Sequence, residues 1–209
     1  ISSAASDVYK RQTYQCAGEY SFTINTYGPT GMETDSPVTI TGISGEASEM
    51  ERVTLTIDML SDNANHVGDG GGLPALIDGK VNTYYHTKWN APVTTEAHYV
   101  QIKLNKPLKD LCFEYDARQS RVNNGGDVKA ATIYGSMNGE FFESMGNEEF
   151  NLPTTNGGHA TAKNNVSGKQ AYNYIRFTPT ARRDKDPLDY TVAGSAWWNM
   201  SEIYLYRIR

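Results

Sequence analysis

The stretch VKAATIYGSMNGEFFESM, residues 128–145, decides the fold class. Its first nine residues are rich in the β-branched, aromatic and small apolar types that suit a half-buried strand. Asn138-Gly139 then supplies the dipeptide most typical of a two-residue hairpin turn, because both central positions of that turn take positive φ. A second strand is expected to start in FFESM. This stretch therefore predicts an antiparallel β-hairpin.

Short strands of the same kind continue through the rest of the chain, without a helix longer than a turn or two and without a βαβ rhythm. Many short strands joined by long polar loops indicate a sandwich or jelly roll. We predict an all-β jelly-roll sandwich of about eight strands. The other predicted strands are 52–60 (RVTLTIDML), 98–104 (HYVQIKL), 111–117 (LCFEYDA), 172–178 (YNYIRFT) and 201–206 (SEIYLY), and the long connections are 62–74, 86–96, 119–127, 151–170 and 181–196.

The charge balance excludes some partners. The 209 residues carry a net charge of −5, and the nearest approach to a basic run, Arg182, Arg183 and Lys185, is interrupted by acids. Duplex nucleic acid is not an expected partner, because phosphate neutralisation needs concentrated Lys and Arg. No apolar stretch approaches membrane-spanning length.

The two cysteines, Cys16 and Cys112, lie outside any metal-binding or redox spacing, and a buried free thiol is the expected state of Cys112.

The first 51 residues divide into three parts. Residues 2–12, SSAASDVYKRQ, resemble the translation of a transposase adapter used in sequencing libraries, so we assign 1–12 to an artefact. Residues 19–27 (EYSFTINTY) and 37–42 (PVTITG) read as two strands, and together they resemble the last strands of a fibronectin-III-like module. We expect 13–43 to be the tail of such a sandwich and 44–51 to be a linker.

From residue 52 onward, five motifs in order resemble the coagulation factor 5/8 type C, or discoidin, domain. They are LIDG (76–79) followed by Thr83 and HTKW (86–89), HYVQIKLNKPL (98–108), YGSMNGEF (134–141), YIRF (174–177) and MSEIYLY (200–206). The resemblance covers 52–209 and implies the galactose-binding-like jelly roll of that family, which overlaps with family 32 of the carbohydrate-binding modules. It also implies a non-catalytic module of a secreted or surface-displayed bacterial protein, monomeric within a larger multidomain chain.

Asp78 is the first candidate for a functional role. A carboxylate in an Asp-Gly turn near a Thr hydroxyl offers the hard oxygen ligands that Ca²⁺ prefers. The resemblance adds a distant acid and a backbone carbonyl, giving a structural calcium site of Asp78, Thr83, Glu202 and the carbonyl of Lys80. The alternative is that Asp78 stabilises its turn and Glu202 is a solvated strand residue.

Loop residues at one end of the sandwich are the candidates for holding a glycan. Sugars are bound by aromatic faces and by planar polar side chains. Alternative roles remain open for some of these residues. Trp89 and one of Trp197 and Trp198 could instead be buried in the core. Arg118 could instead form an ion pair with Asp116 or Asp127. Since neighbours on a strand face opposite ways, Trp197 and Trp198 should not both be buried. The candidate ligand-binding residues are His86, Trp89, Arg118, Arg121, Asn123, Asn124, Tyr190 and Trp197.

Catalysis has little support in the sequence. Glu148 and Glu149 are adjacent, and adjacent residues do not face one substrate as an acid/base pair would. We therefore expect a glycan-binding module and not an enzyme. The alternative is a protein-interaction or spacer module, which predicts that Trp89, Trp197 and Trp198 are all buried.

Overall fold

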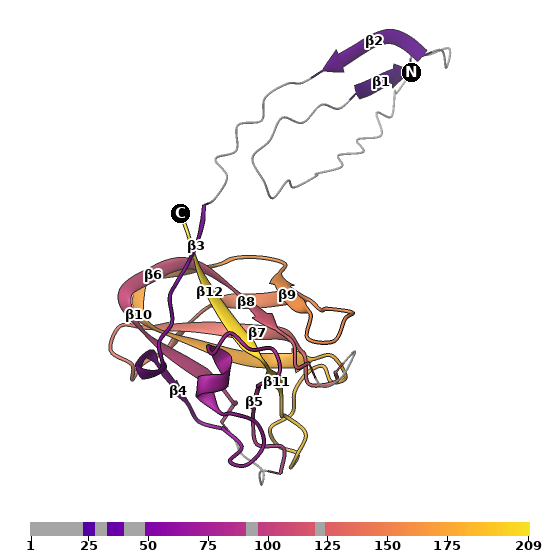
Figure 1. Cartoon of the computed structure of the whole chain (residues 1–209). Coiled ribbons are helices and arrows are strands. Elements are labelled where there is room, and N and C mark those ends of the chain that lie inside the picture. The colour runs from indigo at the N-terminus through magenta and orange to yellow at the C-terminus, as the bar shows by residue number, and fades with distance from the viewer. Residues whose placement is uncertain (1–22, 28–32, 40–48, 91–95, 120–123) are drawn as a thin grey trace. The chain divides into compact units, whose positions relative to one another are not determined.

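The computed structural model describes residues 23–27, 33–39, 49–90, 96–119 and 124–209 (Figure 1). The chain forms two compact units, Ile1–Glu49 and Met50–Arg209. In the first unit, β1 (Thr23–Tyr27) and β2 (Glu33–Thr39) pair antiparallel. The adapter assignment of 1–12 lies outside the described residues, as does most of the linker 44–51, and the fibronectin-III-like origin of 13–43 stays a prediction.

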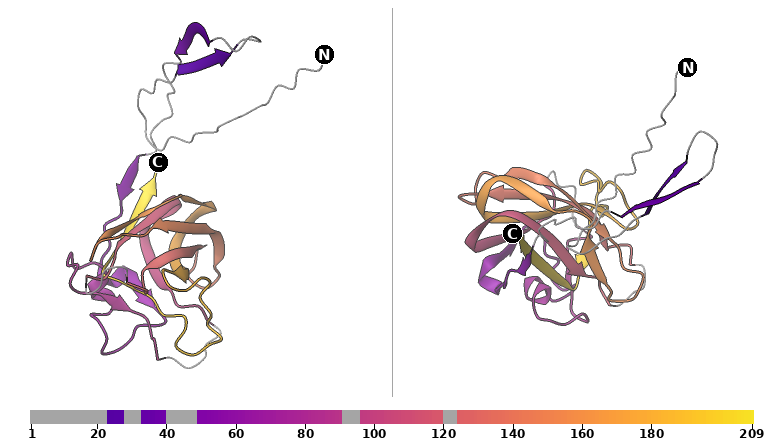
Figure 2. Two further views of the ribbon diagram at one scale, coloured as in Figure 1. Left: turned by 90° about the vertical axis from the view of Figure 1, so that its right-hand side faces the viewer. Right: turned by 90° about the horizontal axis from the view of Figure 1, so that it is seen from above.

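The second unit is a β-sandwich, and the predicted all-β fold class is confirmed. Long loops gather at the end of the sandwich away from the C-terminus (Figure 2). Apart from two 3₁₀ turns, η1 (Ile57–Met59) and η2 (Leu73–Leu76), every element in the described residues of this unit is a strand. The strands are β3 (Met50–Arg52), β4 (Leu60–Asp62), β5 (Tyr85–His86), β6 (Val100–Asp116), β7 (Val128–Ser136), β8 (Glu143–Asn151), β9 (His159–Ala162), β10 (Val166–Arg182), β11 (Asn199–Met200) and β12 (Glu202–Ile208).

Two 17-residue strands, β6 and β10, hold the two layers together. The first part of β6 pairs with β4 and with the middle of β10, whereas its last part pairs with β12 and β9. The prediction of separate strands at 98–104 and 111–117 was wrong, because the polar link between them stays extended. Leu108, in the middle of that link, is buried and anchors it to the core.

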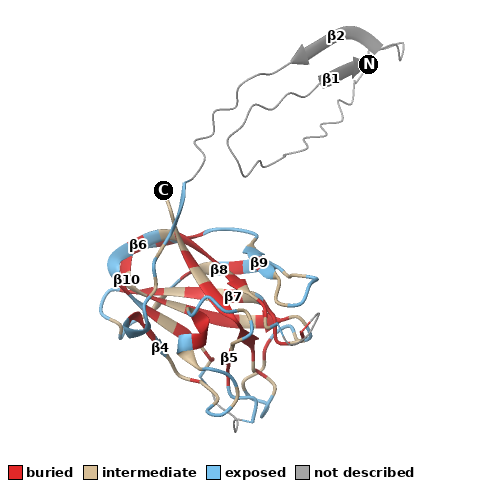
Figure 3. Ribbon diagram, in the orientation of Figure 1, coloured by how far each residue is buried: buried red, intermediate tan, exposed pale blue. Residues whose placement is uncertain are grey.

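The core between the layers is a chain of aromatic contacts. Phe177 packs against Phe113, Phe150 and Trp198 at centroid distances of 5.0, 6.0 and 6.2 Å. Tyr115 is buried too, and its hydroxyl donates to the carbonyl of Val128 at 2.7 Å, which satisfies the one polar atom of that ring. Buried residues accordingly alternate along the strands in Figure 3.

Two loop and strand boundaries differ from the prediction. Residues 52–60 are not one strand: after β3 only Val53 keeps a backbone bond to β12, donating to Leu205 at 2.8 Å. Val53 and Leu55 pack on the core while Thr54 and Thr56 face solvent, so this segment alternates without pairing as a strand. The predicted connection 151–170 contains β9 and the start of β10, because its polar residues lie on exposed strand positions.

Glu148 is the one acidic side chain of β8 that faces inward. It is fully buried, whereas Glu149 is exposed, which agrees with the inference that the two acids do not act as a pair. Its Oε1 accepts the amide of Phe113 at 2.7 Å, and its Oε2 is buried with no partner. Burial raises the pKa of Glu148 to about 9 and that of the nearby Cys112 thiol to about 12. Cys112 is a buried free cysteine, as predicted.

Replacing Glu148 by Gln should stabilise the protein at neutral and alkaline pH. The raised pKa means that the folded state keeps a proton that the unfolded state releases above about pH 4.5, so wild-type stability falls as pH rises from there towards 9. At pH 7 the gain from Glu148→Gln should be on the order of 2–3 kcal/mol. Urea unfolding between pH 5 and 9 measures it. Glu149→Gln is the matched control, and an equal pH dependence of wild type and Glu148→Gln would contradict the prediction.

Candidate functional site

A cleft of about 420 Å³ opens among the loops where β5 and β11 pair, at the end of the sandwich away from the C-terminus (Figure 1). Its walls combine aromatic rings, amides, one carboxylate and one guanidinium. The lining residues are Asp69, His86, Trp89, Arg118, Asn124, Gly194, Trp197 and Asn199.

The β5–β11 pairing decides which side chains reach the cleft. Thr87 and Trp198 bond reciprocally: the Thr87 amide donates to the Trp198 carbonyl at 3.0 Å, and the Trp198 amide donates to Thr87 Oγ1 at 2.8 Å. With this register Tyr85 and Trp198 are both fully buried, and their rings pack in the core at 5.3 Å. Their neighbours His86 and Trp197 face the other way and line the cleft.

His86 presents a hydrogen-bond acceptor. Its Nδ1 lies 2.6 Å from the carbonyl oxygen of Thr87, and because a carbonyl only accepts, Nδ1 carries the proton. In the neutral ring Nε2 is then the acceptor. Burial lowers the pKa of His86 below its usual 6.5, so the ring is neutral at pH 7. The imidazole also stacks on Trp197 at 5.2 Å, which fixes its orientation.

Trp89 is an exposed aromatic platform with a fixed orientation. Its side chain is 45% exposed, its Nε1 donates to Asp69 at 2.8 Å, and its ring stacks on His66 at 5.1 Å with the planes 4° apart. The other oxygen of Asp69 accepts the Tyr84 hydroxyl at 2.7 Å. Burial alone would raise the pKa of Asp69, but these two hydrogen bonds together with the nearby His86 and Arg118 outweigh it and lower the pKa below the usual value.

Arg118 is held by an aromatic ring and not by a close ion pair. Its guanidinium lies over the Tyr84 ring, 3.6 Å from the centroid, and its Nε is buried with no hydrogen-bond partner. No carboxylate of the described residues lies within ion-pair distance of it: Asp127 is bound by Arg183, Asp116 by His159, and Asp69 acts on Arg118 only from a longer range. The ion pair considered for Arg118 is therefore not formed, and its N–H donors remain for a ligand.

Two amides form another part of the wall. Asn124 Nδ2 donates to Asn199 Oδ1 at 2.6 Å. The backbone of Gly126 passes directly behind them: a Cβ at this position would lie 2.2 Å from Asn199 Nδ2 and 2.6 Å from the Trp197 ring. Only glycine lets the backbone come this close, so Gly126 sets the position of that wall.

Of the sequence-predicted ligand residues, the structure brings five into one cleft: His86, Trp89, Arg118, Asn124 and Trp197. Tyr190 lies elsewhere, packed against the core with its hydroxyl on the Pro179 carbonyl at 3.2 Å. Arg121 and Asn123 fall outside the described residues.

The sequence reasoning missed three residues of the cleft, Asp69, Gly194 and Asn199. Asp69 belongs to the run GDGGG, which reads as flexible loop material. Only its contacts with Tyr84 and Trp89 reveal a role, and no pattern in the sequence marks them. Asn199 had a usable signal, since it continues the strand that alternates Trp197 outward and Trp198 inward.

The residues of the predicted calcium site also converge, at a second place beside the start of β12. Thr83 Oγ1 lies 2.8 Å from Asp78 Oδ2 and 2.9 Å from the Lys80 carbonyl oxygen. The Lys80 amide donates both to Asp78 Oδ1 at 2.9 Å and to Glu202 Oε1 at 3.0 Å. Burial, with Asp78 nearby, raises the pKa of Glu202 to about 6. The site thus offers two carboxylates, one hydroxyl and one backbone carbonyl, and none of their hydrogen bonds comes from a cationic side chain. Oxygen ligands of this kind fit a hard divalent cation.

The family model of the F5/8 type C domain matches residues 61–202, and the chain belongs to this family. The sequence matches no curated protein. Among solved structures, the chain is similar to CBM32-3 from a family 31 glycoside hydrolase of Clostridium perfringens (18% identity, 75% of this chain and 94% of that one, TM-score 0.50). It is also similar to a fragment of a chitobiase-like protein from Bacteroides thetaiotaomicron (16% identity, 76% and 93%, TM-score 0.50). In the described part of the chain no helix is long and apolar enough to cross a membrane.

Replacing Gly126 by Ala should destabilise the protein by about 1–3 kcal/mol, because the added methyl overlaps Asn199 and Trp197. Removing one of the overlapping groups should relieve part of the cost. The double variant Gly126→Ala/Asn199→Ala is therefore expected to be more stable than the sum of the two single effects predicts. Urea unfolding of the four proteins measures this, and strictly additive effects would contradict the close approach.

Proposed function

We propose that this domain is a non-catalytic carbohydrate-binding module that holds a glycan in the cleft beside the β5–β11 pair. The observation that carries the proposal is the unpaired Arg118 guanidinium beside the exposed face of Trp89. A fixed aromatic face next to fixed polar groups is the arrangement that binds a sugar, since sugars present C–H surfaces and vicinal hydroxyls. The likeness in fold to the family 32 module CBM32-3 supports it.

Each group has a distinct task in this proposal. Trp89 stacks on the C–H face of a sugar ring, and Arg118 donates to neighbouring hydroxyl oxygens with its planar fork. His86 Nε2 accepts from a hydroxyl, which the lowered pKa of His86 keeps available at pH 7. The Asn124 and Asn199 amides, held against each other, contact the far side of the ring. These groups need no rearrangement to bind, so little ordering cost is expected.

The carboxylate chemistry argues against catalysis in this cleft. Among the described residues, Asp69 is the one acid that lines it, and both of its oxygens already accept hydrogen bonds. Its lowered pKa keeps it ionised, so it is not a proton donor at neutral pH. A binding role agrees better with these bonds than an acid/base role.

The context we propose is a secreted or cell-surface bacterial protein, in which this domain is one monomeric module of a longer chain. The similar module CBM32-3 belongs to a glycoside hydrolase, which supports a role beside polysaccharide-degrading domains. The competing hypothesis of a spacer module expects Trp89, Trp197 and Trp198 to be buried. Trp198 is buried, as one of the adjacent pair should be, but Trp89 is 45% exposed and Trp197 lines the cleft.

We further propose that Asp78, Thr83, Glu202 and the Lys80 carbonyl hold a structural calcium ion. The carboxylates of Asp78 and Glu202 share the Lys80 amide, and a cation between them would offset their repulsion. Bound there, the ion would join the loop after η2 to the start of β12. It would stabilise the loop end without contacting the glycan.

Arg118→Ala and Trp89→Ala should each weaken glycan binding by at least about tenfold, because each removes an interaction of roughly 1.5–3 kcal/mol. A panel of neutral glycans that includes galactosides identifies a ligand, and titration calorimetry then compares the variants. Phe141→Ala removes an aromatic ring that is 80% exposed outside the cleft and serves as the control. A panel without binding, or equal losses in all three variants, would overturn the proposal.

Calcium should raise the melting temperature of the wild-type protein, and EDTA should lower it again. Binding to the folded state at a hundred times its Kd adds about 2.7 kcal/mol to the free energy of unfolding. Asp78→Asn and Glu202→Gln should abolish the calcium-dependent shift, whereas Asp58→Asn, at an exposed acid away from the site, should keep it. A shift that survives in Asp78→Asn would place the ion elsewhere.

A further inference from the structure

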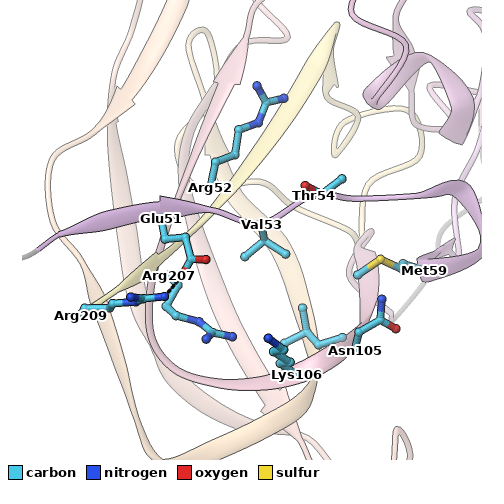
Figure 4. A pocket seen from close by; sticks show the side chains of 10 residues that line it. Glu51, Arg52, Val53, Thr54, Met59, Asn105, Lys106, Arg207 and Arg209 are labelled. Atoms are coloured by element: carbon cyan, nitrogen blue, oxygen red, sulfur yellow. Dashed lines mark hydrogen bonds and ion pairs between the residues drawn. The ribbon is translucent and has the colours of Figure 1, made fainter.

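A second cleft lies where β3, the end of β12 and the middle of β6 meet, towards the C-terminus and away from the loop cleft (Figures 1 and 4). It encloses about 320 Å³. The lining residues are Glu51, Arg52, Val53, Thr54, Met59, Leu104, Asn105, Lys106, Arg207 and Arg209. The proposed glycan cleft shares none of them.

The electrostatic character of this cleft is opposite to that of the chain. Four cationic side chains and one carboxylate line it, in a protein whose net charge is −5. Two of the cations are already used: Arg209 pairs with Glu51, and Arg52 turns away to lie 4.4 Å from the Tyr204 ring centroid. Figure 4 shows Arg52 pointing away from the side chains of the cleft.

The other two cations, Lys106 and Arg207, face the same space from different strands (Figure 4). Within the described residues neither forms an ion pair or a side-chain hydrogen bond. Glu51, directly opposite Arg207 in the strand register, is the one acid of the lining, and it is bound to Arg209. Because that carboxylate is bound to Arg209, an anion that enters between Lys106 and Arg207 would stabilise the two cations.

The floor of the cleft is apolar and preformed. Val53 packs on the core, and Met59 and Leu104 are 5% and 7% exposed, so they are fixed by the packing below them. Exposed Asn105 and Thr54 stand beside this floor and offer an amide and a hydroxyl. An inorganic anion needs only the cations. An apolar floor next to cations and neutral polar groups suits a ligand with a C–H face, hydroxyls and a negative group.

We propose that this cleft is a second binding site, which takes an acidic saccharide such as a hexuronic acid or a sulfated sugar. The carboxylate or sulfate lies between Arg207 and Lys106, with the guanidinium binding two of its oxygens. The ring packs on Val53 and Met59, and its hydroxyls bond to Asn105 and Thr54. The site does not depend on the glycan cleft, because the two have no residue in common.

The test uses the full 209-residue chain with two probes, an oligogalacturonide and a heparin-derived oligosaccharide, in titration calorimetry at low salt. At least one probe should bind, and the double variant Arg207→Gln/Lys106→Gln should weaken that binding by tenfold or more. Binding should also weaken as salt is raised, since two charges carry it. Arg118→Ala should leave it unchanged, which separates this site from the proposed glycan cleft.

The matched control is Lys103→Gln/Lys109→Gln, which removes the same charge from exposed positions of β6 outside the cleft. An equal loss in this control would mean unspecific attraction and would overturn the proposal, as would the absence of binding by both probes or a loss caused by Arg118→Ala. Inorganic phosphate separates the remaining alternative. If it displaces the oligosaccharide at equal concentration, the cleft holds a free oxyanion and the saccharide assignment is wrong.

Discussion

The reciprocal hydrogen bonds between Thr87 and Trp198 are the constraint on which the loop end of this domain depends. They fix a two-residue strand pair, β5 with β11, that is far too short to be stable alone. Its stability comes from Tyr85 and Trp198, which are buried in the aromatic core. Because strand neighbours alternate, the same register turns His86 and Trp197 into the cleft. A one-residue slip would exchange the core pair for the cleft pair, so the binding surface and the core are specified by one register.

The polar groups of the cleft differ in how completely they are bonded. Both oxygens of Asp69 accept hydrogen bonds, from Tyr84 and from Trp89, and thereby orient these two rings. Asn124 donates to Asn199. These bonds keep the walls rigid and leave little capacity for a ligand. Arg118 is the exception, since Tyr84 holds its guanidinium mainly by the face of its ring. Its other N–H donors stay available to a ligand in the cleft, which Arg118 lines.

The alternation of polar and apolar residues was enough to predict the positions of several strands and which of their side chains face the core. The strand 128–136 has the bounds of β7, and it forms the predicted hairpin with β8. The two-residue turn was wrong: Gly135 pairs with Glu143, so Asn138-Gly139 lies inside a longer loop, in which Gly139 has φ 80°. Alternation also separated Trp197 from Trp198. Where tertiary packing overrides the local pattern, prediction failed. The polar link around Leu108 stays in β6 because the core holds it there, and residues 53–56 alternate without a partner strand. Tyr190 failed as a site prediction for the same reason. An aromatic residue in a polar loop suggests a surface for stacking a sugar, and only the tertiary structure shows that this ring packs against the core.

Strands β6 and β12 run side by side and link the two ends of the domain. Asp116 and Glu202 pair at the end near the loops, and Leu111 pairs with Arg207 near the other end. At about 3.3 Å per residue, the five steps from Glu202 to Arg207 span roughly 17 Å of rigid sheet. Arg207 of the second cleft and Glu202 of the proposed calcium site therefore lie on one strand at a fixed separation. The two clefts lie on one sandwich and share no residue, so a long polysaccharide with neutral and acidic units that reached both would bind the second cleft at a raised effective concentration. For such a ligand the sandwich would act as a rigid spacer between two sites of different chemistry.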